Sequence, residues 1–82
     1  MTLEQDLKEE IKKWTKKLDA SLKDVKAVNQ RGIEFLTNIK AYQSDSLHFY
    51  QKKDLIRSYE ALIWAWAYLE IAMQTEILAK NE

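Results

Sequence analysis

The sequence has no cysteine, no proline and a single glycine, Gly32, among its 82 residues. Without cysteine, the chain can form neither a disulfide framework nor a thiolate zinc site. Without proline and with only one glycine, it lacks the residues on which turn-rich β folds depend, whereas long uninterrupted helices suit this composition. These absences predict an all-α protein.

The chain also has no excess of charge and no long hydrophobic run. Its 13 basic and 13 acidic residues cancel, so nothing in the overall charge favours nucleic acid or an anionic membrane. The longest apolar run, Ala61–Leu69, is shorter than the roughly 20 residues of a membrane helix. The first residues are acidic, unlike the basic start of a signal peptide. We expect a cytoplasmic protein that binds neither membranes nor nucleic acid directly.

No catalytic or metal-binding motif is visible. The only histidine, His48, has one carboxylate, Asp45, a turn away, which falls well short of a four-ligand zinc site. No nucleophile is spaced to meet a base. We therefore expect no enzymatic activity, no cofactor and no metal.

What the chain does contain is apolar residues at helical spacing, in stretches covering about residues 3–28, 33–51 and 54–79. Thr2 and Gln5 form a capping-box pattern at the first start, and Asp54 is a suitable N-cap for the third. Short connections make neighbouring helices antiparallel. The sequence predicts one domain, residues 1–82, folded as an up-and-down three-helix bundle with short connections.

The break between the first two helices is predicted at residues 29–32. Asn29 or Gly32 could take the left-handed conformation that ends a helix.

The third predicted helix has apolar residues on two faces. A core stripe consists of Leu55, Tyr59, Leu62, Trp66, Leu69 and Met73. The opposite face carries Ala61, Trp64, Ala67, Tyr68, Ile71 and Ala72. A helix in a three-helix bundle needs about one apolar face, and aromatics beside alanines are typical of protein interfaces. The predicted partner-binding residues are Trp64, Tyr68, Ile71, Ala61 and Ala67.

Three alternatives could cover this second face. They are a larger partner protein, a second copy of the chain in a homodimer, and the first helix wrapping over Trp64. Residues 54–82 contain two basic and five acidic residues, which favours a partner with a basic surface.

A small group of polar residues is expected to be structural. Asp45 flanks the predicted core stripe of the second helix, with Tyr42 one turn before it. A semi-buried carboxylate needs hydrogen-bond donors, and Tyr59 and the backbone at the start of the third helix could supply them. A small ligand-binding bundle would instead need a polar cavity around these three residues.

The second and third helices resemble a mostly archaeal family of domains of unknown function, number three hundred and fifty-seven. The residues that carry the resemblance are Ala41-Tyr42, Asp45, His48-Phe49, Lys53-Asp54, Ala61 and the stretch Trp64–Glu70. The match covers roughly residues 33–78, and Lys53 and Ala67 stand where the family pattern has glycine. The resemblance implies a three-helix bundle in an archaeal cytosol and no assigned activity. Small helical proteins of this sort in archaea can serve as accessory subunits of larger machines, and a replicative DNA polymerase holoenzyme is one concrete candidate partner.

Overall fold

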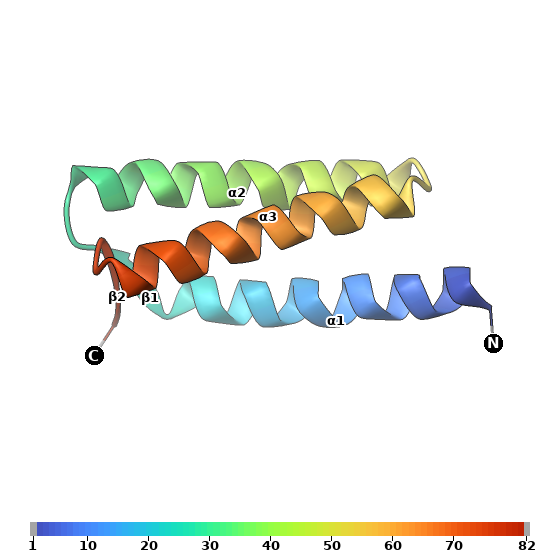
Figure 1. The fold of residues 1–82 in the computed structure, drawn as a ribbon, viewed down its shortest axis with the longest axis horizontal. Helices are drawn as coiled ribbons and strands as arrows, with labels where there is room; N and C mark the ends of the chain where they lie inside the picture. Colours follow the sequence, from blue (N-terminus) through green and yellow to red (C-terminus); the bar gives the residue numbers. More distant parts are fainter. Residues whose placement is uncertain (1, 82) are drawn as a thin grey trace.

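Three antiparallel helices form the body of the protein in the computed structural model, which describes residues 2–81; Met1 and Glu82 of the predicted domain lie outside this range. The elements in chain order are α1 (Leu3–Lys23), β1 (Val25–Ala27), α2 (Gln30–Gln51), α3 (Leu55–Gln74) and β2 (Leu78–Lys80). The helices run alternately up and down, and the two short strands lie at the end opposite the N-terminus (Figure 1). The predicted up-and-down three-helix bundle is confirmed, whereas the strands were not predicted.

Side-chain caps fix where the helices begin. Thr2 Oγ1 accepts from the backbone N–H of Gln5 at 3.1 Å, and Gln5 Oε1 accepts from that of Thr2 at 3.2 Å. Asp54 accepts from the N–H of Arg57 at 3.2 Å. Both predicted caps are confirmed. Asn29, however, does not end a helix in the left-handed conformation: its φ is −150° and it caps the start of α2.

The helices end earlier than predicted, at Lys23 rather than residue 28 and at Gln74 rather than residue 79. The end of α3 is a Schellman motif in which the Ile77 N–H donates to the Ala72 carbonyl, with Glu76 at φ 61°. Because glycine usually occupies that position, the glutamate gives no stop signal in the sequence.

The α2–α3 turn uses the same motif. The Asp54 N–H donates to the Phe49 carbonyl at 2.9 Å, and Lys53 has φ 65°. Lysine therefore takes the left-handed conformation that the glycine of the family pattern would adopt at lower cost.

We expect Lys53→Gly to raise the free energy of unfolding by about 0.5–1 kcal/mol, since it removes the left-handed strain. Urea denaturation measures this change. The matched control is Lys52→Gly, because Lys52 has an ordinary φ of −83° and its replacement should bring no gain. Equal effects at both positions would contradict the explanation.

A two-stranded antiparallel sheet ties the C-terminal segment to the α1–α2 connection, with Val25 opposite Lys80 and Ala27 opposite Leu78. Gly32 is buried beside it. A Cβ atom on Gly32 would collide with the carbonyl oxygen of Ile77 and would lie 3.2 Å from Ala27. No glycine has positive φ, so Gly32 serves close backbone approach and not the predicted left-handed turn.

The core is centred on α3, which contributes most of the buried apolar residues. The core residues are Ile11, Leu18, Ile39, Leu55, Leu62, Ala65, Leu69, Ala72 and Leu78. Small residues let α2 approach α3 closely, and there Ser46 Oγ donates to the Ser58 carbonyl at 2.9 Å. In return, Ser58 Oγ donates to the Ser46 carbonyl at 2.8 Å. This reciprocal pair satisfies two buried hydroxyls at the crossing.

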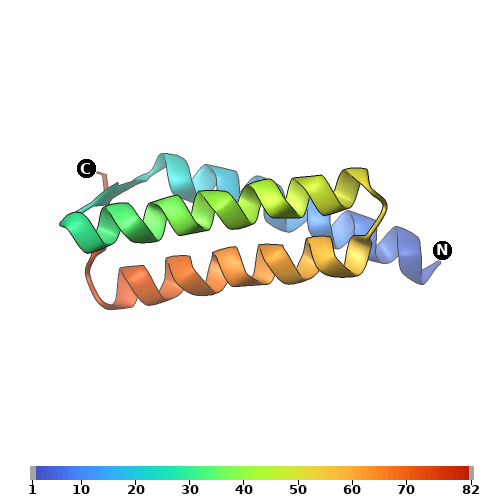
Figure 2. The same ribbon diagram turned by 90° about the horizontal axis from the view of Figure 1, so that it is seen from above.

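Helix α1 packs against the opposite flank of α3. The Trp14 and Trp66 rings meet edge to face, with centroids 5.7 Å apart, and Trp66 Nε1 donates to the Trp14 carbonyl at 3.3 Å. Seen from above, α2 and α3 run side by side with α1 behind them (Figure 2). The first turn of α1 extends past the α2–α3 turn, and Leu3 is 85% exposed.

Candidate functional site

Four large apolar side chains are exposed along one side of α3. They are Ile56, Ile63, Trp64 and Ile71, each about half or more exposed, and we call them the α3 outer face. The spacing of seven or eight residues from Ile56 to Ile63 and Trp64, and again to Ile71, puts them on one side of the helix. A patch of this kind on a small domain is typical of a binding surface.

Aromatic side chains from α2 support this face. Phe35, Tyr42, Trp64 and Tyr68 form what we call the aromatic cluster. Tyr42 stacks on Tyr68 with ring centroids 5.5 Å apart and on Trp64 at 6.4 Å, while Phe35 meets Tyr68 edge to face at 5.4 Å. These contacts hold Trp64 in place while leaving 55% of it exposed.

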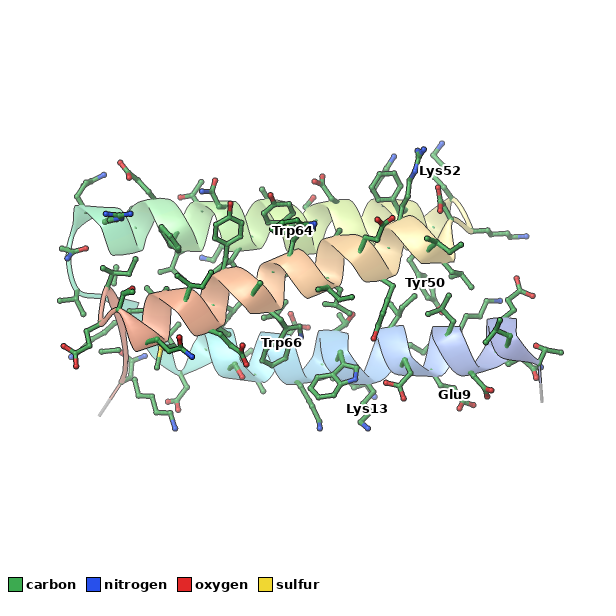
Figure 3. The ribbon with its side chains drawn as sticks, in the orientation of Figure 1. Glu9, Lys13, Tyr50, Lys52, Trp64 and Trp66 are labelled. Carbon is green, nitrogen blue, oxygen red and sulfur yellow. The ribbon has the colours of Figure 1, made fainter. Side chains whose placement is uncertain are left out.

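The two tryptophans of α3 lie on opposite flanks of the helix, Trp64 toward α2 and Trp66 toward α1 (Figure 3). Trp66 is half-buried against Trp14, as the core stripe requires. The covering of Trp64 by the first helix, one of the three alternatives, does not occur, because the ring that stacks on Trp64 belongs to α2.

The predicted partner-binding residues divide into three groups. Trp64 and Ile71 are exposed, and Ala67 and Tyr68 are half-buried. Ala61 is only 7% exposed and cannot contribute to a binding surface as predicted. The reason is that α2 crosses α3 at Ser58, and Ala61 lies one turn further along that flank.

Sequence reasoning missed Ile56 and Ile63, which are 70% and 50% exposed. The buried side of α3 is centred on its small residues rather than on the predicted core stripe of large residues. A helical wheel centred on Ser58, Ala65 and Ala72 would have placed both isoleucines outside.

The predicted polar group does not assemble. Asp45 is exposed, and the start of α3 is capped by Asp54 instead. Tyr59 lies beside Trp14 and Trp66 on the α1 flank, whereas Tyr42 stacks on the other flank. The polar cavity that a ligand-binding bundle would need therefore does not form from these three residues.

The aromatic cluster changes the pKa of the Tyr42 hydroxyl. Its pKa is raised above the ordinary value of 10.0, first by partial burial and then by the neighbouring Tyr68 phenol and Asp45 carboxylate. A folded-state pKa above the unfolded one means that the neutral phenol stabilises the fold below pH 10, and that this contribution is lost as pH rises through the raised pKa.

We therefore expect the wild type to lose more unfolding free energy between pH 9 and pH 11 than the Tyr42→Phe variant. Urea denaturation at both pH values measures the difference, because the two proteins differ only in the phenol oxygen of residue 42. Parallel pH profiles would show that the phenol of Tyr42 is not perturbed by its neighbours.

The described residues offer no metal centre: within residues 2–81, no three His, Asp or Glu side chains gather closely enough to hold an ion. Over the same range, no helix is both long enough and apolar enough to cross a membrane. The exposed apolar surface of α3 is therefore the feature on which we base a functional proposal.

Comparison with known proteins shows what the chain is similar to. The model of a family described as protein of unknown function (DUF357) matches residues 13–78. The chain belongs to this family. The family resemblance seen in the sequence is confirmed, and the match begins within α1 rather than at the start of α2.

A solved structure from this family shares the fold. It is the crystal structure of protein AF1782 from Archaeoglobus fulgidus, which is 36% identical and superposes with a TM-score of 0.89. The alignment covers 98% of this chain and 100% of that chain. No curated protein matches. These comparisons establish family and fold, so a functional proposal must rest on the surface chemistry.

Proposed function

We propose that the protein is a non-enzymatic interaction module that docks on a larger protein through the α3 outer face. The observation that carries this proposal is the exposure of Trp64, which is 55% accessible although its ring is held by Tyr42 and Tyr68. A tryptophan held in place but half in water is suited to fill a partner pocket, since little side-chain freedom remains to be lost on binding.

Charge around the face indicates the chemistry of the partner. Glu60 lies one turn from Ile56 and one from Trp64, and Glu70 borders Ile71. Both carboxylates are exposed, and neither is in the ion pair found within residues 2–81, which joins Arg57 to Asp54. A basic partner surface would satisfy both carboxylates.

A homodimer through the same face is the second candidate. If two α3 helices pair antiparallel about the Ile63–Trp64 step, Ile56 of one copy meets Ile71 of the other. The same pairing leaves Glu60 opposite Ala67 without a cation. We therefore favour a different, basic partner over a second copy.

We further propose that the protein works in an archaeal cytoplasm as an accessory subunit. The archaeal source of the related structure supports this setting. A replicative DNA polymerase holoenzyme is the first complex to test as partner.

Site-specific photo-crosslinking in native extract tests the proposal. A photoreactive phenylalanine analogue replaces Ile71 in one variant and Glu9 in a control, because Glu9 points away from α3 (Figure 3). We expect one saturable crosslinked protein from position 71 and none from position 9. Equal crosslinking from both positions would refute docking through α3.

Light scattering at micromolar concentration separates the two candidates. The proposal predicts a monomer in isolation. A dimer that resists dilution and is lost in Trp64→Ala would assign the face to self-association instead.

A further inference from the structure

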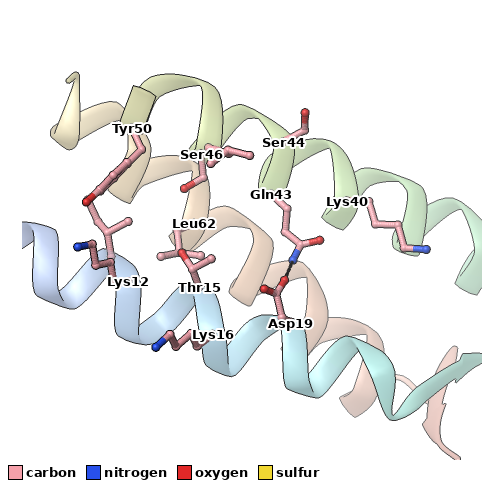
Figure 4. Close-up of a pocket in the computed structure, with 12 residues that line it drawn as sticks. Lys12, Thr15, Lys16, Asp19, Lys40, Gln43, Ser44, Ser46, Tyr50 and Leu62 are labelled. Atoms are coloured by element: carbon pink, nitrogen blue, oxygen red, sulfur yellow. Dashed lines mark hydrogen bonds between the residues drawn. The ribbon is translucent and has the colours of Figure 1, made fainter. Parts of the chain in front are cut away.

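A groove with a volume of about 600 Å³ runs between α1 and α2. Two buried apolar residues line it, Ile11 of α1 and Leu62 of α3, and we call them its floor. Leu47 and Tyr50 of α2 also line it, and Figure 4 shows Tyr50 and Leu62 among the lining side chains. It lies away from the α3 outer face and shares no residue with it. The groove exists because α1 packs on α3 and has few contacts with α2. One hydrogen bond, from Gln43 of α2 to Asp19 of α1, crosses it (Figure 4).

Lysines line both sides of the groove. Lys12 and Lys16 come from α1 and Lys40 from α2. Asp19 is the one carboxylate in its lining, and it already accepts a hydrogen bond from Gln43 Nε2 at 2.7 Å. The ion pair found within residues 2–81 does not involve these lysines. The apolar floor is therefore bordered by three lysine side chains that form no ion pair within residues 2–81.

The dimensions and walls of the groove suit a helix. The lining spans Ile11–Asp19 on α1 and Lys40–Tyr50 on α2, which at 1.5 Å per residue is about 12–15 Å, or two to three helical turns. Two antiparallel helices with an apolar floor between them resemble a four-helix bundle that lacks its fourth helix. A small molecule would fit poorly, because good ligand pockets bury about 70–90% of their ligand, whereas this groove is open to solvent.

We propose that this groove binds an amphipathic helix of a partner protein. Apolar side chains at positions i, i+4 and i+7 of that helix face Leu62 and Leu47, and carboxylates beside them face Lys12, Lys16 and Lys40. The bound helix completes a four-helix bundle. This site is separate from the α3 outer face, so the protein would contact its partners on two sides.

Two designed helical peptides test the proposal. Both carry leucines at i, i+4, i+7 and i+11; one has glutamates flanking the leucines and the other has lysines. Fluorescence anisotropy measures binding of each labelled peptide to the full chain. We expect the glutamate peptide to bind at least about tenfold more tightly and to weaken with added salt. NMR shift changes should centre on the amides of Gln43, Ser44 and Leu47.

Variants identify the residues responsible. Combined Lys12→Glu, Lys16→Glu and Lys40→Glu should reverse the peptide preference, whereas the control Lys13→Glu with Lys17→Glu should keep it, since Lys13 and Lys17 lie over the Trp14 ring. Leu47→Asp changes an exposed residue and should abolish binding without unfolding the chain. Trp64→Ala should leave peptide binding intact, which separates this site from the proposed docking face.

Several results would overturn the proposal. They are failure of both peptides to bind, equal affinity for both, shift changes centred on Trp64 or Ile71, and self-association that the triple lysine variant removes. The last result would assign the groove to a second copy of the chain.

Discussion

Replacing Gly32 with alanine should lower the free energy of unfolding by about 3 kcal/mol. The new Cβ would collide with the Ile77 carbonyl oxygen, which also accepts a hydrogen bond from the Val28 N–H at 3.0 Å. Overpacking costs about 1–3 kcal/mol and a lost hydrogen bond about 0.5–1.5 kcal/mol. For a domain of this size, the melting temperature should fall by roughly 12–24 °C.

The sign of this effect is diagnostic. Helix propensity alone predicts that glycine to alanine in a helix stabilises by about 1 kcal/mol. Asn38→Ala, at an exposed position in the same helix, is the control and should change stability little. If Gly32→Ala raises the melting temperature, α2 does not lie as close to the α3–β2 turn as the structure shows.

Replacing Trp64 with alanine should remove partner binding while the fold survives. A central aromatic anchor contributes roughly 2–4 kcal/mol, so we expect the dissociation constant to rise about thirtyfold to several-hundredfold. The loss of stacking with Tyr42 and Tyr68 should cost only about 1 kcal/mol of stability. Thermal unfolding measures the stability, and calorimetric titration with the crosslinked partner measures the affinity.

Trp66 provides the matched comparison. Trp66→Ala should cost about 3 kcal/mol of stability, because it empties the contact with Trp14 and removes a hydrogen bond. Trp66→Phe keeps the ring contact, so it should fold and bind the partner normally. If Trp64→Ala and Trp66→Ala destabilise the protein equally, Trp64 belongs to the core rather than to an interface.

The three-helix architecture could be predicted because its signals are local in the sequence. Apolar spacing, the Thr2–Gln5 capping box and the Asp54 cap define the starts of two helices. The ends of α2 and α3 carry no glycine signal, because Lys53 and Glu76 occupy the left-handed positions where glycine is usual. The two strands were not predicted, because each has only three residues and forms through a long-range pairing that no local pattern encodes.

The candidate site was predicted in part because exposure depends on where neighbouring helices pack. Trp64 and Ile71 lie outside as the helical wheel indicated, but Ala61 is buried where small residues admit α2. Large side chains dominate a hydrophobic stripe, whereas the closest helix contact is made through small ones such as Ser58. The groove between α1 and α2 could not be predicted, since it depends on how far the two helices spread.

The most direct test of the central claim is calorimetric titration of the crosslinked partner against the wild type, Trp64→Ala and Trp66→Phe, with a melting curve for each. The account predicts binding by the wild type and Trp66→Phe, and a loss of about thirtyfold or more for a Trp64→Ala variant that still melts near the wild type. Undiminished binding by a folded Trp64→Ala variant would contradict it.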